Sequence, residues 1–513
     1  MEFRKDIAMK AVKRITALLL AALLVLAAAA CSDNPAGEDG KQPDAVTDTP
    51  SAADAQNPET DAPEEIYVPD ALDGVDLGGA TSRIFCWESW DPGEFFVEED
   101  TGEIVVSAVY NRNLTVEERL NVTLAWDQYP RNDAAYGSTL KNAVQNQNAS
   151  GDGTFDIVAC YGMRIASCAT DALLMNLCDA ERVDLSMPWY YKSATKAGTL
   201  HKNYVYFTAG DLSYNALARM SGVFFNQKLV ADYNIEDPYD MVLEGVWTID
   251  KMHEVIRDLY VDLDGDGKAG QGDQYGVMCA NDQMQTLYYG TGSHFIEHDA
   301  DDTPVLSEDI YSERTLTILE KYLGVFSEEA AFKNSIGDDP TIFDTGRSLF
   351  YIYPLGHVSE GGLRNSDINY GFIPQPKVDE GEDTYHASVT NAVTLFAIPL
   401  VIESNERASA VFECLASEGY RQVSPVVFEQ AYKAKYNYDD SARQTTIFDM
   451  IRQNAVFDLG KIFSSDLFSG FSNGVIGDFI WNNNTNYASQ VQKLTKTWNK
   501  KMEKMTEKLN FGD

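Results

Sequence analysis

The sequence predicts an α/β protein with mainly parallel sheets flanked by helices. Apolar, strand-like runs at 82–87, 122–126 and 156–160 alternate with amphipathic helical segments, an order that is typical of βαβ units. The chain has 513 residues. Its folded part, from residue 66 onward, is too long for one small domain and suits two.

The N-terminal region has the order of a secretory signal. Basic residues precede an uncharged run at 15–30, which is shorter than the roughly 20 apolar residues of a membrane-spanning helix. The residues before Cys31 resemble a bacterial lipobox, although Ala28 stands where that motif usually has Leu. We expect 1–30 to be a signal peptide and Cys31 to carry acyl chains that hold the protein on the outer face of the membrane. Ordinary cleavage after Ala30, which leaves a free thiol, is the alternative.

Acidic side chains outnumber basic ones and give a net charge of −39. This excess argues against nucleic acid as a partner and against direct binding to anionic lipid. The segment 31–65 is acidic, lacks aromatic residues and has Lys41 as its only base. It cannot bury enough apolar surface to offset its chain entropy, so we expect a disordered tether.

The stretch 209–259 carries the clearest local signals. An apolar strand-like run at 222–225 leads into a short helix, and a second helix begins after Thr248, a suitable N-cap. Its apolar residues recur at helical spacing from Ile249 onward. This pattern predicts a strand followed by two helices, which an ordinary αβ unit could also produce.

The order FNQK at 225–228 and WTIDKM at 247–252 resembles the central segment of the extracellular solute-binding proteins of bacterial ABC importers, the family that includes maltodextrin-binding proteins. The inserted Gln227 and the swapped Trp-Thr order depart from the family pattern. Further blocks resemble a carbohydrate-type, Firmicutes-type subgroup: VEERLNVT at 116–123, MPWYY at 187–191, YVYFTAGD at 204–211, YGFIPQPKVDE at 370–380 and KAKYNYDD at 433–440.

This resemblance implies a two-lobed, periplasmic-binding-protein-like fold of type II with the ligand cleft between the lobes. The implied parts are a first lobe at 66–221, a second lobe at 222–387, a return to the first lobe at 388–459, and C-terminal helices, mainly in the second lobe, at 460–513. The implied protein is a monomer without catalytic residues that captures a small solute, a sugar or oligosaccharide, and delivers it to the permease subunits of an ABC transporter.

Candidate solute-binding residues lie mainly at the ends of predicted strands, beyond which open α/β sheets bind ligands. Sugars are bound by planar aromatic rings together with carboxylates, amides and Arg. The candidates are Trp87, Glu88, Trp90, Tyr161, Arg164, Asp211, Tyr214, Tyr289, His357 and Asn391. For most of them taken singly, a packed ring or a solvated charge is the better interpretation, whereas as a set they favour a cleft.

The segment 262–273 has the spacing of a calcium-binding EF-hand loop, with carboxylates at positions one, three, five and twelve and Gly at six. The candidate ligands are Asp262, Asp264, Asp266, Lys268 and Asp273. Position twelve is Asp instead of Glu, which puts bidentate ligation in doubt. We expect a structural Ca²⁺; an acidic surface turn is the alternative.

Two other functions remain open at this point. A surface-anchored glycoside hydrolase needs only two carboxylates in a cleft, and the chain has many acids. A calcium-dependent adhesion lipoprotein would use the acidic loop to hold a macromolecule. No Gly-x-Ser-x-Gly, HExxH or P-loop motif occurs.

Overall fold

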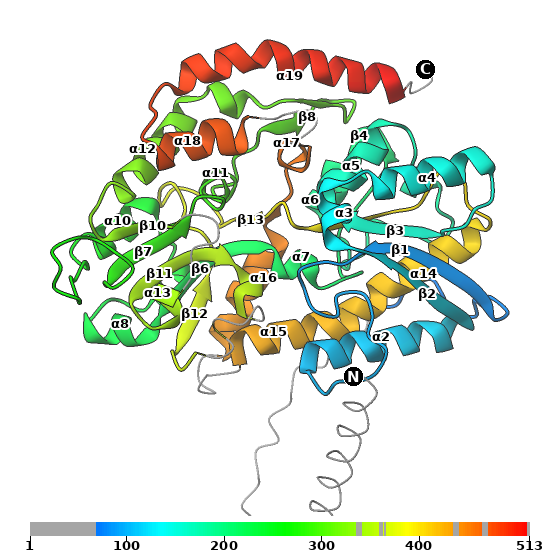
Figure 1. Ribbon diagram of the computed structural model, residues 1–513, viewed down its shortest axis with the longest axis horizontal. Coiled ribbons are helices and arrows are strands. Elements are labelled where there is room, and N and C mark those ends of the chain that lie inside the picture. Colours follow the sequence, from blue (N-terminus) through cyan, green and yellow to red (C-terminus); the bar gives the residue numbers. More distant parts are fainter. Residues whose placement is uncertain are drawn as a thin grey trace, which may run out of the picture. The chain divides into compact units, whose positions relative to one another are not determined.

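The computed structural model describes residues 68–334, 341–358, 363, 366–433, 441–463 and 470–509 (Figure 1). The expected signal peptide, Cys31, the acidic tether and most of the 433–440 block lie outside these residues. Within the ranges that the structure covers, none of the helices has the length and apolar composition that a membrane crossing requires.

The first sheet has the strand order β14-β3-β1-β2. Strand β1 pairs in parallel with β2 and β3, and β14 pairs antiparallel with β3, so the expected parallel βαβ series is confirmed. The strands are β1 (Ala80–Trp87), β2 (Val122–Tyr129), β3 (Ile157–Tyr161) and β14 (Thr394–Ala397). The helices of this region include α2 (Ile104–Leu120), α3 (Arg131–Tyr136), α4 (Thr139–Ser150), α5 (Gly162–Thr170) and α14 (Asn405–Glu418).

The second sheet has the order β10-β7-β11-β6-β13-β15, and β12 also pairs with β6. Strands β10, β7 and β11 are parallel, whereas β6 runs antiparallel to β11, β12 and β13. The strands are β6 (Met220–Asn226), β7 (Tyr275–Ala280), β10 (Ala331–Asn334), β11 (Ser348–Pro354), β12 (Tyr370–Ile373), β13 (Ala387–Val389) and β15 (Ala455–Val456). The associated helices include α8 (Gln227–Asp232), α10 (Ile249–Ile256), α12 (Glu313–Val325) and α13 (Thr341–Asp344).

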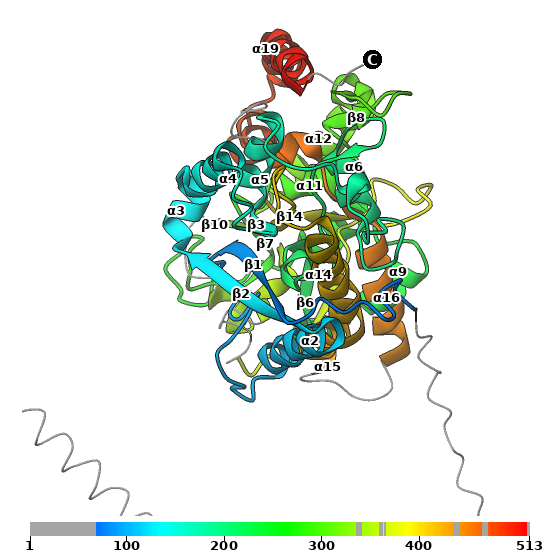
Figure 2. The ribbon, with the colours of Figure 1, turned by 90° about the vertical axis from the view of Figure 1, so that its right-hand side faces the viewer.

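The remaining helices connect or cover these sheets. Helix α2 packs beside α14 and α15 (Ser424–Lys433), as both ribbon views show (Figures 1 and 2). The remaining helices include α6 (Lys192–Gly198), α7 (Asn215–Ala218), α9 (Pro238–Leu243), α11 (Thr286–Tyr289), α15 (Ser424–Lys433), α16 (Ser441–Gln453), α17 (Leu459–Ile462), α18 (Asp478–Trp481) and α19 (Tyr487–Leu509).

The stretch 209–259 contains the predicted strand and both predicted helices, and the short helix α9 lies where the sequence predicted a loop. Asn226 caps α8, because its side chain accepts hydrogen bonds from the backbone N–H groups of Lys228 and Leu229 at 3.0 and 3.3 Å. Thr248 caps α10 by accepting from Lys251 N at 3.1 Å, so the expected N-cap is confirmed.

The return to the first lobe, which we expected to begin at residue 388, starts with two strands in different sheets, within 388–399. Strand β13 pairs with β6 in the second sheet and β14 pairs with β3 in the first. The four residues between them carry the chain across. One apolar run therefore contributes a strand to each of the two sheets. Its composition alone could not show this division.

A buried carboxyl group ties α14 to the loop before α6. The Trp189 indole N–H and the Tyr190 hydroxyl donate to the two Glu413 oxygens at 3.0 and 2.7 Å. Burial raises the pKa of Glu413 from its ordinary value of 4.5 to about 7. The folded state therefore holds a proton on Glu413 at a pH where the unfolded chain has released it.

We expect Glu413 to make stability fall as pH rises. Its contribution is fully present below pH 4.5 and is lost as pH rises to about 7, because the folded state binds the proton more tightly than the unfolded state. In Glu413→Gln, melting temperature should change less between about pH 4.5 and pH 7 than in the parent. Glu406→Gln, an exposed acid on the same helix, should keep the parental slope. Equal slopes in all three proteins would contradict this assignment.

Candidate functional site

The carboxyl ends of strands from both sheets meet where the chain crosses between them. Strand β6 begins at Met220, and its Ser221 lies opposite Pro354, the last residue of β11. Strand β14 begins at Thr394, opposite Tyr161 at the end of β3. The two crossing segments contact each other through Thr390 N, which donates to Arg219 O at 2.9 Å. Ligands of open α/β sheets bind beyond such carboxyl edges.

A buried ion pair fixes this crossing to the loop after β1. Arg219 Nη2 lies 2.6 Å from Asp91 Oδ1, and both residues are less than a tenth exposed. The Asn215 amide donates to the other Asp91 oxygen at 2.5 Å, while its own oxygen accepts from Thr394 N at 2.6 Å. The loop and both crossing segments are thereby connected through hydrogen bonds.

Aromatic rings gather at the carboxyl edge of the first sheet. Trp90 and Tyr161 are half-buried, and their ring centroids lie 5.8 Å apart. Trp87 is fully buried beneath them, 5.0 Å from Trp90 and 5.5 Å from Tyr161, and its indole N–H donates to Thr394 Oγ1 at 3.0 Å. Trp90 and Tyr161 can therefore offer a ring face to a solute, while Trp87 supports them from the core.

A small pocket lies beside this aromatic edge. It is lined by Gly162, Met163, Val389, Thr390, Asn391, Val393, Phe457, Asp458, Lys461 and Ile462. Gly162 N donates to Val393 O at 2.9 Å, so the end of β3 and the crossing segment form one wall. The pocket thus lies where the two carboxyl edges meet, and Asn391 is the predicted site residue that lines it.

Lys461 is the basic residue that lines this pocket. Its side chain is buried, its ammonium donates to Ser388 Oγ at 2.8 Å, and it lies 5.1 Å from the centroid of the Tyr289 ring. Burial lowers the pKa of Lys461 to about 7. Sequence reasoning missed this residue, although a lysine between the apolar pairs 456–457 and 462–463 is a sign of a buried amine.

Amide groups and a carboxyl group line the carboxyl edge of the second sheet. The side-chain oxygens of Gln283, Gln285 and Asn334 are buried without a hydrogen-bond partner in the part of the chain that the structure describes. Burial raises the pKa of the neighbouring Asp282. Buried amide oxygens without partners are uncommon in folded proteins and are suited to accept hydrogen bonds from a hydroxylated ligand.

Two predicted site residues, Glu88 and Arg164, remain at or near the first carboxyl edge. Glu88 is exposed, and its carboxylate accepts from Arg131 N at 3.2 Å. Arg164 is half-buried and follows Met163 of the pocket wall.

The structure places the other predicted residues in buried networks. Asp211 pairs with Arg452 at 2.5 Å, and the Tyr214 hydroxyl donates to Pro92 O at 2.6 Å. His357 Nε2 lies 2.9 Å from Asp344 Oδ1, and Tyr289 shares a hydrogen bond of 2.9 Å with Ser472. Tyr289 reaches the pocket indirectly, since its ring contacts Lys461.

The acidic loop folds so that its carboxylates converge. Oxygens of Asp262, Asp264 and Asp273 lie within 4.8 Å of one another. Asp262 accepts from Gly265 N and Gly267 N at 2.7 and 2.9 Å, and Gly267, at loop position six, has φ +72°. Asp266 instead accepts from Lys268 N at 2.7 Å. Three converging carboxylates on a tight loop fit a hard divalent cation.

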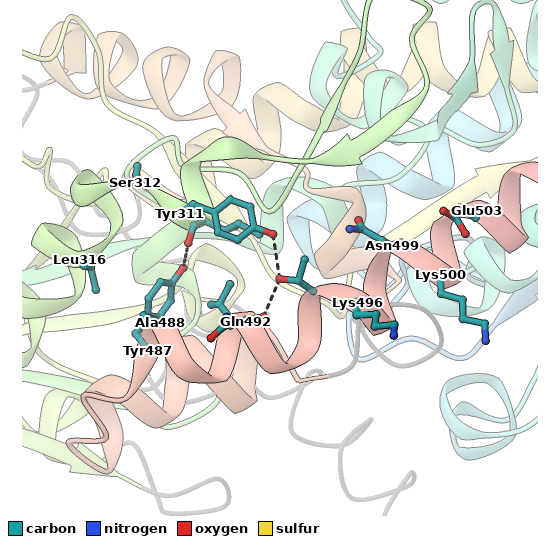
Figure 3. A pocket seen from close by; sticks show the side chains of 13 residues that line it. Tyr311, Ser312, Leu316, Tyr487, Ala488, Gln492, Lys496, Asn499, Lys500 and Glu503 are labelled. Atoms are coloured by element: carbon teal, nitrogen blue, oxygen red, sulfur yellow. Dashed lines mark hydrogen bonds between the residues drawn. The ribbon is translucent and has the colours of Figure 1, made fainter.

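A larger groove, of about 860 Å³, runs along α19 (Figure 3). Tyr311 reaches across to this helix, where its hydroxyl lies 3.1 Å from Thr495 Oγ1. The walls of the groove include Ile310, Leu316, Val491, Lys496 and Lys500. None of the predicted site residues lines this groove, so it is separate from the carboxyl edges.

Comparison with known proteins shows the fold. No protein-family model matches the chain, and no curated protein does. The sugar-binding protein MalE from Xanthomonas citri is 13% identical, with a TM-score of 0.55 over 84% of this chain and 100% of that one. A cyclo/maltodextrin-binding protein complexed with maltotetraose is 13% identical, with a TM-score of 0.50 over 84% of this chain and 97% of that one. The chain has the two-lobed fold of these proteins, as its sequence predicted.

Proposed function

We propose that this protein is an extracellular solute-binding protein that captures a sugar or oligosaccharide and delivers it to the permease of an ABC transporter. The observation that carries the proposal is the meeting of both carboxyl edges at the crossing, with Trp90 and Tyr161 beside a pocket lined from both sides. The sugar-binding proteins that share the fold support this choice of solute.

The proposed mechanism is closure of two lobes around the solute. In this proposal the first lobe comprises 66–221 and 388–459, and the second comprises 222–387 with most of the C-terminal helices. Trp90 and Tyr161 stack on the sugar ring, and the buried amides of the second sheet accept hydrogen bonds from its hydroxyls. Contacts to both lobes exist only in the closed state, so the solute shifts the population toward closure. The solute leaves unchanged, and the protein acts as a monomer.

A screen of mono- and oligosaccharides by thermal shift tests this function. We expect at least one sugar to raise the melting temperature, because a ligand that binds only the folded state stabilises it. X-ray scattering with that sugar should show a smaller radius of gyration. Turnover of a glycoside would favour the hydrolase, and binding only to a macromolecule in the presence of calcium would favour the adhesin.

Trp90→Ala should weaken binding of the sugar found in this screen. Loss of the stacking ring should cost on the order of 1–3 kcal/mol of binding free energy, as for a buried aromatic anchor. Trp126→Ala is the matched control, because Trp126 lies on β2 and stacks on Phe96 at 5.8 Å, away from the pocket. Titration calorimetry of both variants would measure the difference, and equal affinities would argue against stacking on Trp90.

We further propose that acyl chains on Cys31 anchor the protein to the outer face of the membrane. The support is the lipobox-like junction and the acidic, aromatic-free segment that follows it. Cys31→Ser should move the protein from the detergent phase to the aqueous phase in detergent partitioning, because the acyl chains supply the membrane affinity. A variant that partitions like the parent would contradict lipidation, and Cys178→Ser serves as the control.

We also propose that the acidic loop holds a structural Ca²⁺ through Asp262, Asp264 and Asp273, together with the Lys268 carbonyl and Asp266. Removing calcium with excess chelator should lower the melting temperature while sugar affinity stays the same, because a cation bound only by the folded state stabilises it. Asp264→Asn should lose the response to calcium. An identical melting curve with calcium and with chelator would contradict the proposal.

A further inference from the structure

Lys461 is a buried amine without a direct ion pair among the described residues. Burial lowers its pKa, and the nearby carboxylates of Asp458 and Asp282 oppose that shift. The residue is 2% exposed and belongs to α17. In the sequence it lies between the apolar residues Val456 and Phe463. An ammonium group has three N–H bonds to satisfy. Among the residues that the structure describes, the Ser388 hydroxyl is its hydrogen-bond acceptor at 2.8 Å, and the Tyr289 ring lies 5.1 Å away.

Asp458, the neighbouring carboxylate, is occupied by other donors. Its Oδ2 accepts from Phe295 N and Ile296 N at 2.8 and 3.2 Å, and its Oδ1 accepts from Lys461 N at 3.1 Å. His294 Nδ1 lies 3.6 Å from the same carboxylate. Asp458 thus caps α17 and orders the segment at 294–296, whereas no described carboxylate lies within 4.0 Å of Lys461 Nζ.

The position of Lys461 directs this charge toward the solute site. The residue lines the pocket together with Met163 at the end of β3 and Asn391 in the crossing segment. The pocket has a volume of about 10 Å³, so it has room for a single oxygen-sized group and not for a whole sugar. Gly162, the residue after Tyr161, also lines the pocket, which places the pocket at the edge where the rings of Tyr161 and Trp90 lie.

We propose that Lys461 binds an anionic group of the solute, so that the preferred ligand is an acidic sugar such as a uronate. This inference rests on the proposed sugar-binding function and deepens it. A carboxylate oxygen accepts a charge-assisted hydrogen bond from the ammonium and brings an opposite charge into direct contact with it. A neutral hydroxymethyl group in the same position supplies no opposite charge.

The test compares galacturonic acid, galacturonamide and galactose, and glucuronic acid with glucose, by thermal shift and titration calorimetry. The uronates should bind roughly 10- to 100-fold more tightly than the amide and the neutral sugars, as expected of a charged hydrogen bond. Lys461→Met should abolish this preference, so that the ratio of uronate affinity to neutral-sugar affinity falls to about one.

Lys377→Met is the matched control. Lys377 is also buried, lies 5.1 Å from the Tyr385 ring, and donates to Glu382 O at 2.9 Å outside the pocket. Its loss affects folding alone, so the preference for uronates should persist. A structural role for Lys461 would lower the melting temperature without changing the ratio of acidic to neutral affinity, which would overturn the proposal.

Failure of this inference is distinguishable from failure of the proposed function. If neutral sugars bind as tightly as uronates, or if Lys461→Met keeps the preference, the anionic subsite is wrong while sugar binding stands. If neither these sugars nor any oligosaccharide of the wider screen binds, the proposed function is wrong and the inference fails with it.

Discussion

The buried ion pair between Arg219 and Asp91 is the interaction on which the rest of the site depends. The pair lies where the chain leaves the first sheet, and each of its two side chains is less than a tenth exposed. Breaking a buried pair leaves an uncompensated charge, so such a pair tolerates few alternative arrangements. Through Asn215 and Thr394 it also fixes the start of β14. The register of both crossing segments is thereby set, and the two carboxyl edges are held together.

Burial at this crossing determines the chemistry of the site. Burial, with Asp91 nearby, raises the pKa of Glu94 to about 7, and burial lowers that of Lys461 to about 7. Both groups are thus less charged than their residue types suggest. A site with two half-buried rings and, among the described residues, buried amide oxygens without hydrogen-bond partners suits hydroxylated ligands, because each hydroxyl needs an acceptor once water is excluded.

The acidic loop and the solute site are independent features of the fold. The loop lies between α10 and β7, where the amino end of β7 begins at Tyr275. The proposed solute site lies beyond the opposite end of the same strand, where Asp282 and Gln283 follow Ala280. A cation in the loop would therefore stabilise the second sheet without contacting the solute, since the loop carboxylates hydrogen-bond mainly within the loop itself.

The sequence alone determined the α/β class, the parallel βαβ series and the cap at Thr248, because these depend on periodicity and on contacts within a few residues. It also indicated the aromatic edge at Trp90 and Tyr161, since strand ends can be read from the sequence. Only the tertiary structure decided that Trp87, Asp211 and His357 are buried, that 388–399 divides between two sheets, and that Lys461 reaches the pocket. These outcomes rest on partners more than a hundred residues away for Asp211 and Trp87, and local patterns carry no information about such partners.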